Sequence, residues 1–229
     1  MLRLRCSVIL LGALLAAPSV GAAGGTYEYV GAFDGALWTS GALATMGVGD
    51  SLSIVGTFVP SSGEWVAVPW DTASYDYTFW IHGWAAEVVT EDSTRRSIVL
   101  AGPGRIDLYR ESVPAEFGYG VYPPNATCPA SFADGELVLR TEATSGLVSL
   151  HLASGIFTLS LGDATYVAGL YLPEVLTECG VCAADLDFTG AISQPAPAGF
   201  DAPVSGHLFN TSGVGVEPES WGRTKASYR

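Results

Sequence analysis

Apolar and polar side chains alternate along most of this chain with a period of two residues. The run from Val148 to Leu152 places apolar residues at every second position, and the run from Phe157 to Leu161 does the same. Successive side chains of a β-strand point to opposite faces, so each run predicts a strand with one buried face. Ser154-Gly155 lies between the two runs and has the residue types of a tight turn. The pattern therefore predicts a β-hairpin.

Alternation of the same kind predicts strands at further segments, which turn residues separate. The predicted strands are Thr26–Phe33, Ser51–Val59, Tyr75–Trp84, Arg95–Ala101, Arg105–Arg110, Glu136–Thr141, Thr165–Tyr171, Ala184–Ile192 and Val204–Phe209. The predicted turns are Gly49-Asp50, Pro60–Gly63, Gly102–Gly104 and Asp134-Gly135. Helical periodicity is nearly absent. We expect an all-β fold, a single antiparallel β-sandwich or barrel of about ten strands within residues 23–210.

Two stretches depart from this alternation. Glu111–Ala133 combines four prolines with aromatic residues, which predicts a long connection between two strands. Gln194–Pro203 is rich in proline and alanine, which predicts an extended connector before the last strand.

The first 22 residues have the composition of a secretory signal peptide. Arg3 and Arg5 precede an apolar run that is too short to span a bilayer, and small residues follow at Val20-Gly21-Ala22. We expect residues 1–22 to be removed and the mature protein to be secreted or displayed on the cell surface, with the periplasm as a further destination. No later apolar run is long enough for a transmembrane helix.

Acidic residues strongly outnumber basic ones. The chain has 23 Asp and Glu against 10 Lys and Arg, for a net charge of −13. Such a surface repels a phosphate backbone, so nucleic acid is excluded as a partner. Hydrophobic residues make up 48% of the chain and charged residues only 14%, which is the balance of a chain that folds around a core.

Three cysteines remain after removal of the leader: Cys128, Cys179 and Cys182. Export to an oxidising compartment favours disulfide pairing. Cys179 and Cys182 can close a local ring, or either of them can pair with Cys128 and fasten the long proline-rich connection to a later part of the chain. The sequence leaves these alternatives open.

Asp185, Asp187 and Thr189 place oxygen donors at alternate positions before Gly190, as in the first half of a calcium-binding loop. Ala196 stands where such a loop needs its bidentate acid. The alternative is a strand whose acids point to solvent while Leu186 and Phe188 point inward. Calcium is thus the one cofactor candidate, and otherwise we expect no cofactor.

No catalytic motif accompanies this pattern, since no Ser lies in a G-x-S-x-G elbow and the three histidines have no motif around them. Trp38, Trp65 and Trp70 lie in or near predicted turns, where tryptophan stacks on sugars or anchors partners. We therefore expect a non-catalytic structural or binding module, with surface polysaccharide or the export and anchoring machinery as candidate partners. The alternatives are a lectin-like protein and a secreted carbohydrate-active hydrolase with acids from the set Asp107, Glu111, Asp134 and Glu136.

Three segments together resemble a group of exported bacterial all-β proteins of unknown function. They are Gly49–Phe58, Tyr75–Phe79 leading to Gly104–Tyr109, and Ser131–Leu139, which follow one another as G-D-S, Y-x-Y-T-F and F-x-D-G-x-L-x-L strands. This resemblance implies the architecture and export, and it implies no activity.

The C-terminal tail, residues 211–229, ends in SWGRTKASYR. It resembles the short W-G-x-x-K-x-x-Y/F-R ending of many exported bacterial proteins. The positions that carry the resemblance are Trp221, Lys225, Tyr228 and Arg229, and they suggest a recognition tag for export or surface attachment.

Overall fold

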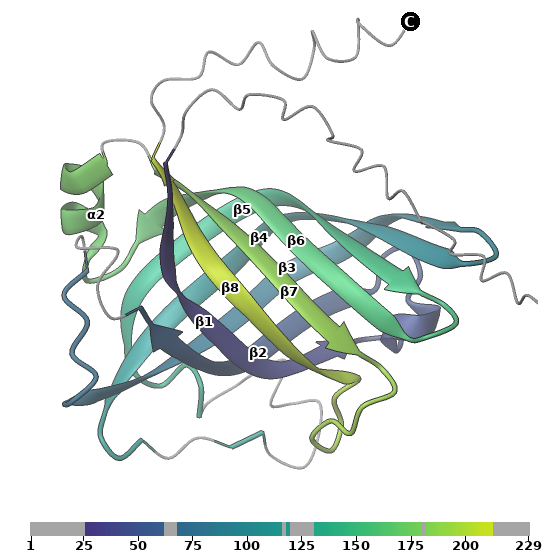
Figure 1. Cartoon of the computed structure of the whole chain (residues 1–229), viewed down its shortest axis with the longest axis horizontal. Helices are drawn as coiled ribbons and strands as arrows, with labels where there is room; N and C mark the ends of the chain where they lie inside the picture. The colour runs from purple at the N-terminus through teal and green to yellow at the C-terminus, as the bar shows by residue number, and fades with distance from the viewer. Residues whose placement is uncertain (1–25, 62–67, 116–117, 120–130, 180–181, 213–229) are drawn as a thin grey trace, which may run out of the picture.

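The computed structural model describes residues 26–61, 68–115, 118–119, 131–179 and 182–212. They form a closed antiparallel β-barrel (Figure 1). Its eight strands are β1 (Thr26–Thr39), β2 (Ser51–Pro60), β3 (Tyr75–Glu91), β4 (Arg95–Ser112), β5 (Glu136–His151), β6 (Ile156–Ala168), β7 (Cys182–Ala191) and β8 (Ala202–Ser212). The predicted all-β fold is confirmed, and of the two predicted architectures the protein adopts the barrel.

Each strand pairs with the next one in the chain, and β8 pairs with β1 to close the ring. The closing ladder is long: it runs from the pair Thr26 and Ser212 at one rim to the pair Leu37 and Ala202 near the other. Closure satisfies the backbone hydrogen-bonding groups that an open sheet would leave along its two edge strands.

The structure has fewer and longer strands than the sequence predicted. The segments Arg95–Ala101 and Arg105–Arg110 belong to one strand, β4, and the predicted turn at Gly102–Gly104 is wrong. There the pairing of β4 with β5 shifts register between Ala101 and Gly104, as in a β-bulge. β5 and β6 each unite two predicted strands in the same way, and β6 shifts register against β7 between Leu161 and Ala164. A bulge uses the same small residues as a turn, so composition does not separate them.

Other local predictions are confirmed. The hairpin turns between His151 and Ile156, where Gly155 adopts a positive φ of 68° and donates a hydrogen bond to the His151 carbonyl. Glu111–Ala133 largely covers the connection from β4 to β5, and Gln194–Pro203 leads into β8.

The pattern did not predict the short helix α2 (Leu172–Cys179), which buries Val175 against the barrel, or the 3-10 turn η1 (Leu43–Thr45). No helix in the described ranges is long and apolar enough to cross a membrane.

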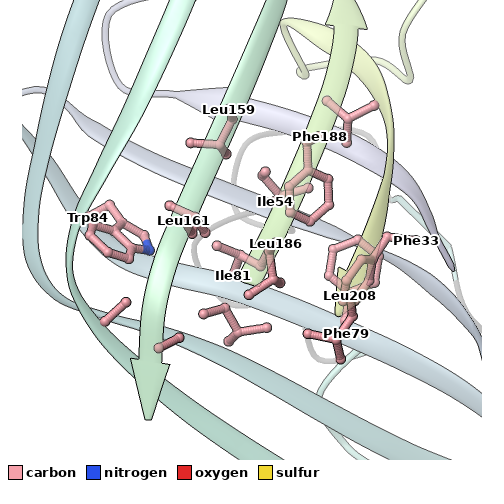
Figure 2. Packing of buried hydrophobic residues seen from close by; sticks show 14 of the residues in the cluster. Phe33, Ile54, Phe79, Ile81, Trp84, Leu159, Leu161, Leu186, Phe188 and Leu208 are labelled. Carbon is pink, nitrogen blue, oxygen red and sulfur yellow. The ribbon is translucent and has the colours of Figure 1, made fainter. Parts of the chain in front are cut away.

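Apolar side chains fill the interior of the barrel (Figure 2). At its centre Phe33 contacts Phe79 and Phe188, with ring centroids 4.7 and 5.2 Å apart. Leu159, Leu161 and Leu186 project into the same core. The outward positions of β6 and β7 carry the polar residues Thr158, Ser160, Asp187 and Thr189, which are exposed and pair across the two strands. The alternation in the sequence therefore separates an apolar inside from a polar outer wall.

Trp84 is the largest fully buried side chain, and it fits only because β4 has no side chain beneath it. A Cβ atom on Gly104 would lie 1.8 Å from Cε2 of Trp84. The glycine of the bulge therefore makes room for the indole ring.

We predict that Gly104→Ala lowers the free energy of unfolding by about 1–3 kcal/mol, because the added methyl group displaces Trp84 from a packed core. Gly118→Ala is the matched control, since a Cβ atom there meets nothing within 4 Å. Urea unfolding followed by tryptophan fluorescence measures both. Equal losses in the two variants would show that the contact with Trp84 is not the cause.

Candidate binding site

A depression of about 300 Å³ opens on the outer wall over β1, β2 and β3. We call it the tryptophan depression; its lining residues are Trp38, Ser51, Leu52, Ser53, Trp80, His82 and Gly83. Trp38 and Ser53 are cross-strand partners on β1 and β2. Their neighbours Leu37 and Ile54 point into the core, so alternation directs Trp38 and Ser53 outward.

Trp80 is held in one orientation. Its Nε1 donates a hydrogen bond to Oγ of Ser53 over 3.0 Å, and Ser53 Oγ donates in turn to the carbonyl of Ile81 over 3.0 Å. The His82 ring stacks on the indole with a centroid separation of 3.7 Å and an interplanar angle of 21°. The aromatic floor of the depression is thus fixed before any ligand arrives.

A buried carboxylate lies behind this stack. Asp107 on β4 has a side chain only 1% exposed, and its Oδ2 lies 3.3 Å from Nε2 of His82. Arg140 on β5 donates from Nε to Oδ1 over 2.6 Å and from Nη2 to Oδ2 over 2.7 Å. The hydroxyl of Tyr109 donates to Oδ2 over 3.1 Å. A charged, bidentate partner and two further contacts offset the cost of burying the charge.

These contacts fix the ionisation of the cluster. Burial by itself raises the pKa of Asp107, but the hydrogen bonds from Arg140 and His82 outweigh it and bring the pKa to about 2. Burial, together with the negative charge of Asp107, raises the pKa of Tyr109 to about 12. The hydrogen bond to Asp107 raises the pKa of Arg140 above its ordinary value. Asp107 is therefore a carboxylate and Tyr109 a neutral phenol at neutral pH.

The connection between β4 and β5 lies on the outer wall next to the depression. Thr78, two residues before Trp80 on β3, donates a hydrogen bond from Oγ1 to the Phe132 carbonyl over 2.8 Å. Phe132 is fully buried, and Tyr119 packs between it and Phe200, with centroid distances of 5.2 and 5.6 Å. Burial raises the pKa of Tyr119. The described ends of this long connection are thus pinned to the barrel.

A second depression, of about 390 Å³, lies on the outer wall over β6, β7 and β8. Its lining residues are Ser160, Leu161, Gly162, Asp185, Leu186, Asp187 and Phe209. Leu186 and Phe188 are buried and Asp187 and Thr189 are exposed, as the strand alternative predicted. Ser160 Oγ donates to Oδ1 of Asp187 over 2.8 Å. Calcium at Asp185, Asp187 and Thr189 stays a prediction; within the described ranges no group of three or more His, Cys, Asp or Glu is placed to hold a metal ion.

The remaining predicted residues lie elsewhere. Trp70 packs on Phe58 and Tyr77 against the core, with centroid distances of 5.5 and 5.2 Å, and it does not line the depression that contains Trp38. Cys182 is buried and disulfide-bonded. Its pairing stays a prediction, because Cys128 and the side chain of Cys179 fall outside the description. Also outside it are Trp65, Trp221, Lys225, Tyr228 and Arg229.

The binding site predicted from the sequence did not include Trp80, His82 or Arg140. Trp80 and His82 occupy alternate positions of one strand, which was a signal that they share a face. The pairing of Asp107 with Arg140 depends on the register between β4 and β5, which places them directly opposite each other. No local sequence motif predicts the register between β4 and β5.

Comparison with known protein families, with curated proteins and with solved structures finds no match for this chain. The geometry of the outer wall is therefore the main guide to function.

We predict that Asp107→Asn lowers the free energy of unfolding by about 3 kcal/mol, because it leaves the Arg140 guanidinium beside a neutral amide. The matched control is Glu142→Gln, which removes a more exposed carboxylate–arginine pair between β4 and β5. The side chains of Arg105 and Glu142 are 44% and 35% exposed, so loss of this ion pair lowers the free energy of unfolding by less than about 1 kcal/mol. Urea unfolding of both variants measures the change in the free energy of unfolding. Similar changes in the two variants would contradict a special role for the buried pair.

Stability also depends on pH through Asp107. The folded chain holds the pKa of this carboxyl at about 2. As pH falls, Asp107 therefore becomes protonated at a higher pH in the unfolded chain than in the folded chain. We predict that about 2 kcal/mol of stability is present above about pH 4 and is lost between about pH 4 and pH 2. Unfolding free energies at a series of pH values test this. Asp107→Asn lacks that part of the pH dependence, and an unchanged profile in this variant would refute the assignment.

Proposed function

We propose that this protein is a non-catalytic extracellular binding module that holds a saccharide on the outer wall of its barrel. The observation that carries the proposal is the pair Trp38 and Trp80 at one depression, beside the polar side chains Ser51 and His82. Both indoles are partly exposed.

The chemistry of the depression suits a sugar ring. A pyranose presents an apolar C–H face and a rim of hydroxyl groups, and an indole face beside hydrogen-bonding side chains matches both. Trp80 is already fixed by Ser53 and His82, so little side-chain freedom is lost on binding.

The outer wall is the part of this barrel that offers such groups. The interior is filled by apolar side chains (Figure 2). The half-exposed residues Trp38, Trp80 and His82 lie outside it. The predicted leader, residues 1–22, supports an extracellular setting, where saccharides are abundant on cell surfaces.

The state of the polar groups favours binding over hydrolysis. A carboxyl with a pKa of about 2, held by Arg140, does not donate a proton to a leaving group at neutral pH. The Ser53 hydroxyl is engaged by Trp80 and by the Ile81 carbonyl. These groups position the aromatic floor, which is the task of a binding site.

A glycan array probed with the mature protein, followed by calorimetry on the strongest ligand, tests the proposal. We expect Trp38→Ala and Trp80→Ala each to weaken binding by about tenfold or more, since stacking on an aromatic ring is worth about 1 kcal/mol or more beyond the area it buries. Trp70→Phe, which alters a tryptophan outside the depression, leaves the affinity unchanged. Absence of any glycan ligand, or a ligand indifferent to both Ala variants, would overturn the proposal.

A further inference from the structure

The tryptophan depression contains one ring nitrogen whose protonation is determined by the residues behind it. Nε2 of His82 lies 3.3 Å from Oδ2 of Asp107. The same oxygen accepts hydrogen bonds from Nη2 of Arg140 over 2.7 Å and from the hydroxyl of Tyr109 over 3.1 Å. An ionised carboxylate has no proton to donate, so Nε2 of His82 has to be the donor in this contact.

The other nitrogen of the ring is thereby left as an acceptor. A neutral imidazole carries one proton, and with that proton on Nε2 the lone pair of Nδ1 is free. No residue in the described ranges donates to Nδ1 of His82. Nδ1 is not among the buried polar atoms that lack a partner, so it is open to solvent. Because His82 lines the depression, a molecule bound there can reach this lone pair.

The hydrogen-bond donors beside His82 are already used inside the protein. Nε1 of Trp80 donates to Oγ of Ser53, and Oγ of Ser53 donates to the carbonyl of Ile81. Neither group has a proton left for a ligand, whereas Nδ1 of His82 needs a donor. A sugar hydroxyl supplies that donor while the C–H face of the same sugar packs on an indole.

Size and charge narrow the ligand to one uncharged sugar ring. The depression measures about 300 Å³, which is at the lower end of the range for ligand pockets. Arg105, opposite His82 in the β3–β4 ladder, pairs with Glu142 over 3.0 Å. Arg140 is held by Asp107. Both guanidinium groups are therefore committed to a carboxylate of the protein, and neither is free to pair with an acidic sugar.

We propose that His82 determines the specificity of the depression: its Nδ1 accepts a hydrogen bond from one hydroxyl group of an uncharged pyranose unit, and Asp107, held by Arg140, keeps Nδ1 free of a proton. This inference rests on the proposed function and adds to it the class of sugar and the residue that selects it. His82 contacts the sugar, whereas Asp107 and Arg140 are positioning residues that act through it. A sugar without that hydroxyl leaves the lone pair unpaired and binds more weakly.

The protonation of the ring is measured first, on the mature protein without any sugar. Long-range proton–nitrogen NMR at about pH 8, where an imidazole is neutral, separates a protonated ring nitrogen from one with a lone pair. The spectrum of His82→Phe identifies the signals of His82, since the chain has three histidines. We expect a protonated Nε2 and an unprotonated Nδ1. A ring protonated on Nδ1, alone or in equal mixture, would overturn this inference and leave the proposed function untouched.

The contact with a sugar is measured by titrating the methyl glycosides of glucose, galactose, mannose and xylose into the labelled protein. We expect at least one of them to shift the indole signals of Trp38 and Trp80 together with the Nδ1 signal of His82. Among its monodeoxy derivatives, one is expected to bind about five- to tenfold more weakly than the parent glycoside. In His82→Phe, which keeps an aromatic ring on Trp80 and removes both nitrogens, the same deoxy derivative and its parent are expected to bind equally.

His207→Phe is the matched control, because it removes an exposed imidazole that contacts the rings of Tyr29 and Phe209 outside the depression. This variant is expected to keep the full difference between the parent glycoside and its deoxy derivative. An equal difference in His82→Phe would overturn the role of His82 alone. So would a methyl glucuronide that binds more tightly than the glucoside.

Failure of the site and failure of this inference give different results. If none of the four neutral glycosides binds but a glycan on the array depends on both tryptophans, the proposed function stands and the present inference is wrong. If the array also finds no such glycan, both are wrong.

Discussion

The pairing of β1 with β8 is the constraint on which the rest of this structure depends. It joins the first and last strands over most of their length and turns a meander of neighbouring hairpins into a ring. Without it, two strands would expose unpaired backbone groups, and the shared core of Phe33, Phe79 and Phe188 would open, because Phe33 and Phe188 come from opposite ends of the chain.

Closure also determines where function can reside. Inward side chains are committed to the core, so the polar groups that a ligand could contact lie on the outer wall. Arg140 on β5 holds Asp107 and, through it, the stack of His82 on Trp80. A buried ion pair in the wall of the barrel therefore stiffens the aromatic surface beside it.

The sequence predicted what depends on local alternation and missed what depends on register. Leu150 and Leu159 alternate with polar neighbours, and both are buried as expected. Gly102–Gly104 has the composition of a turn but forms a bulge, since only the partner strand shows that pairing resumes beyond it. Asp107 meets Arg140 because two strands separated by a long connection align them, and residue spacing along the chain does not encode this alignment.

The pairing of β1 with β8 also makes the two ends of the barrel different. Thr26 and Ser212 are partners at one rim, so the chain enters and leaves the barrel at the same end, whereas β1 carries Trp38 to the opposite end. A tether at either terminus would therefore leave Trp38 at the far end of the barrel. The length of β1 would set the distance between such a tether and this indole, so the body of the domain is itself a spacer.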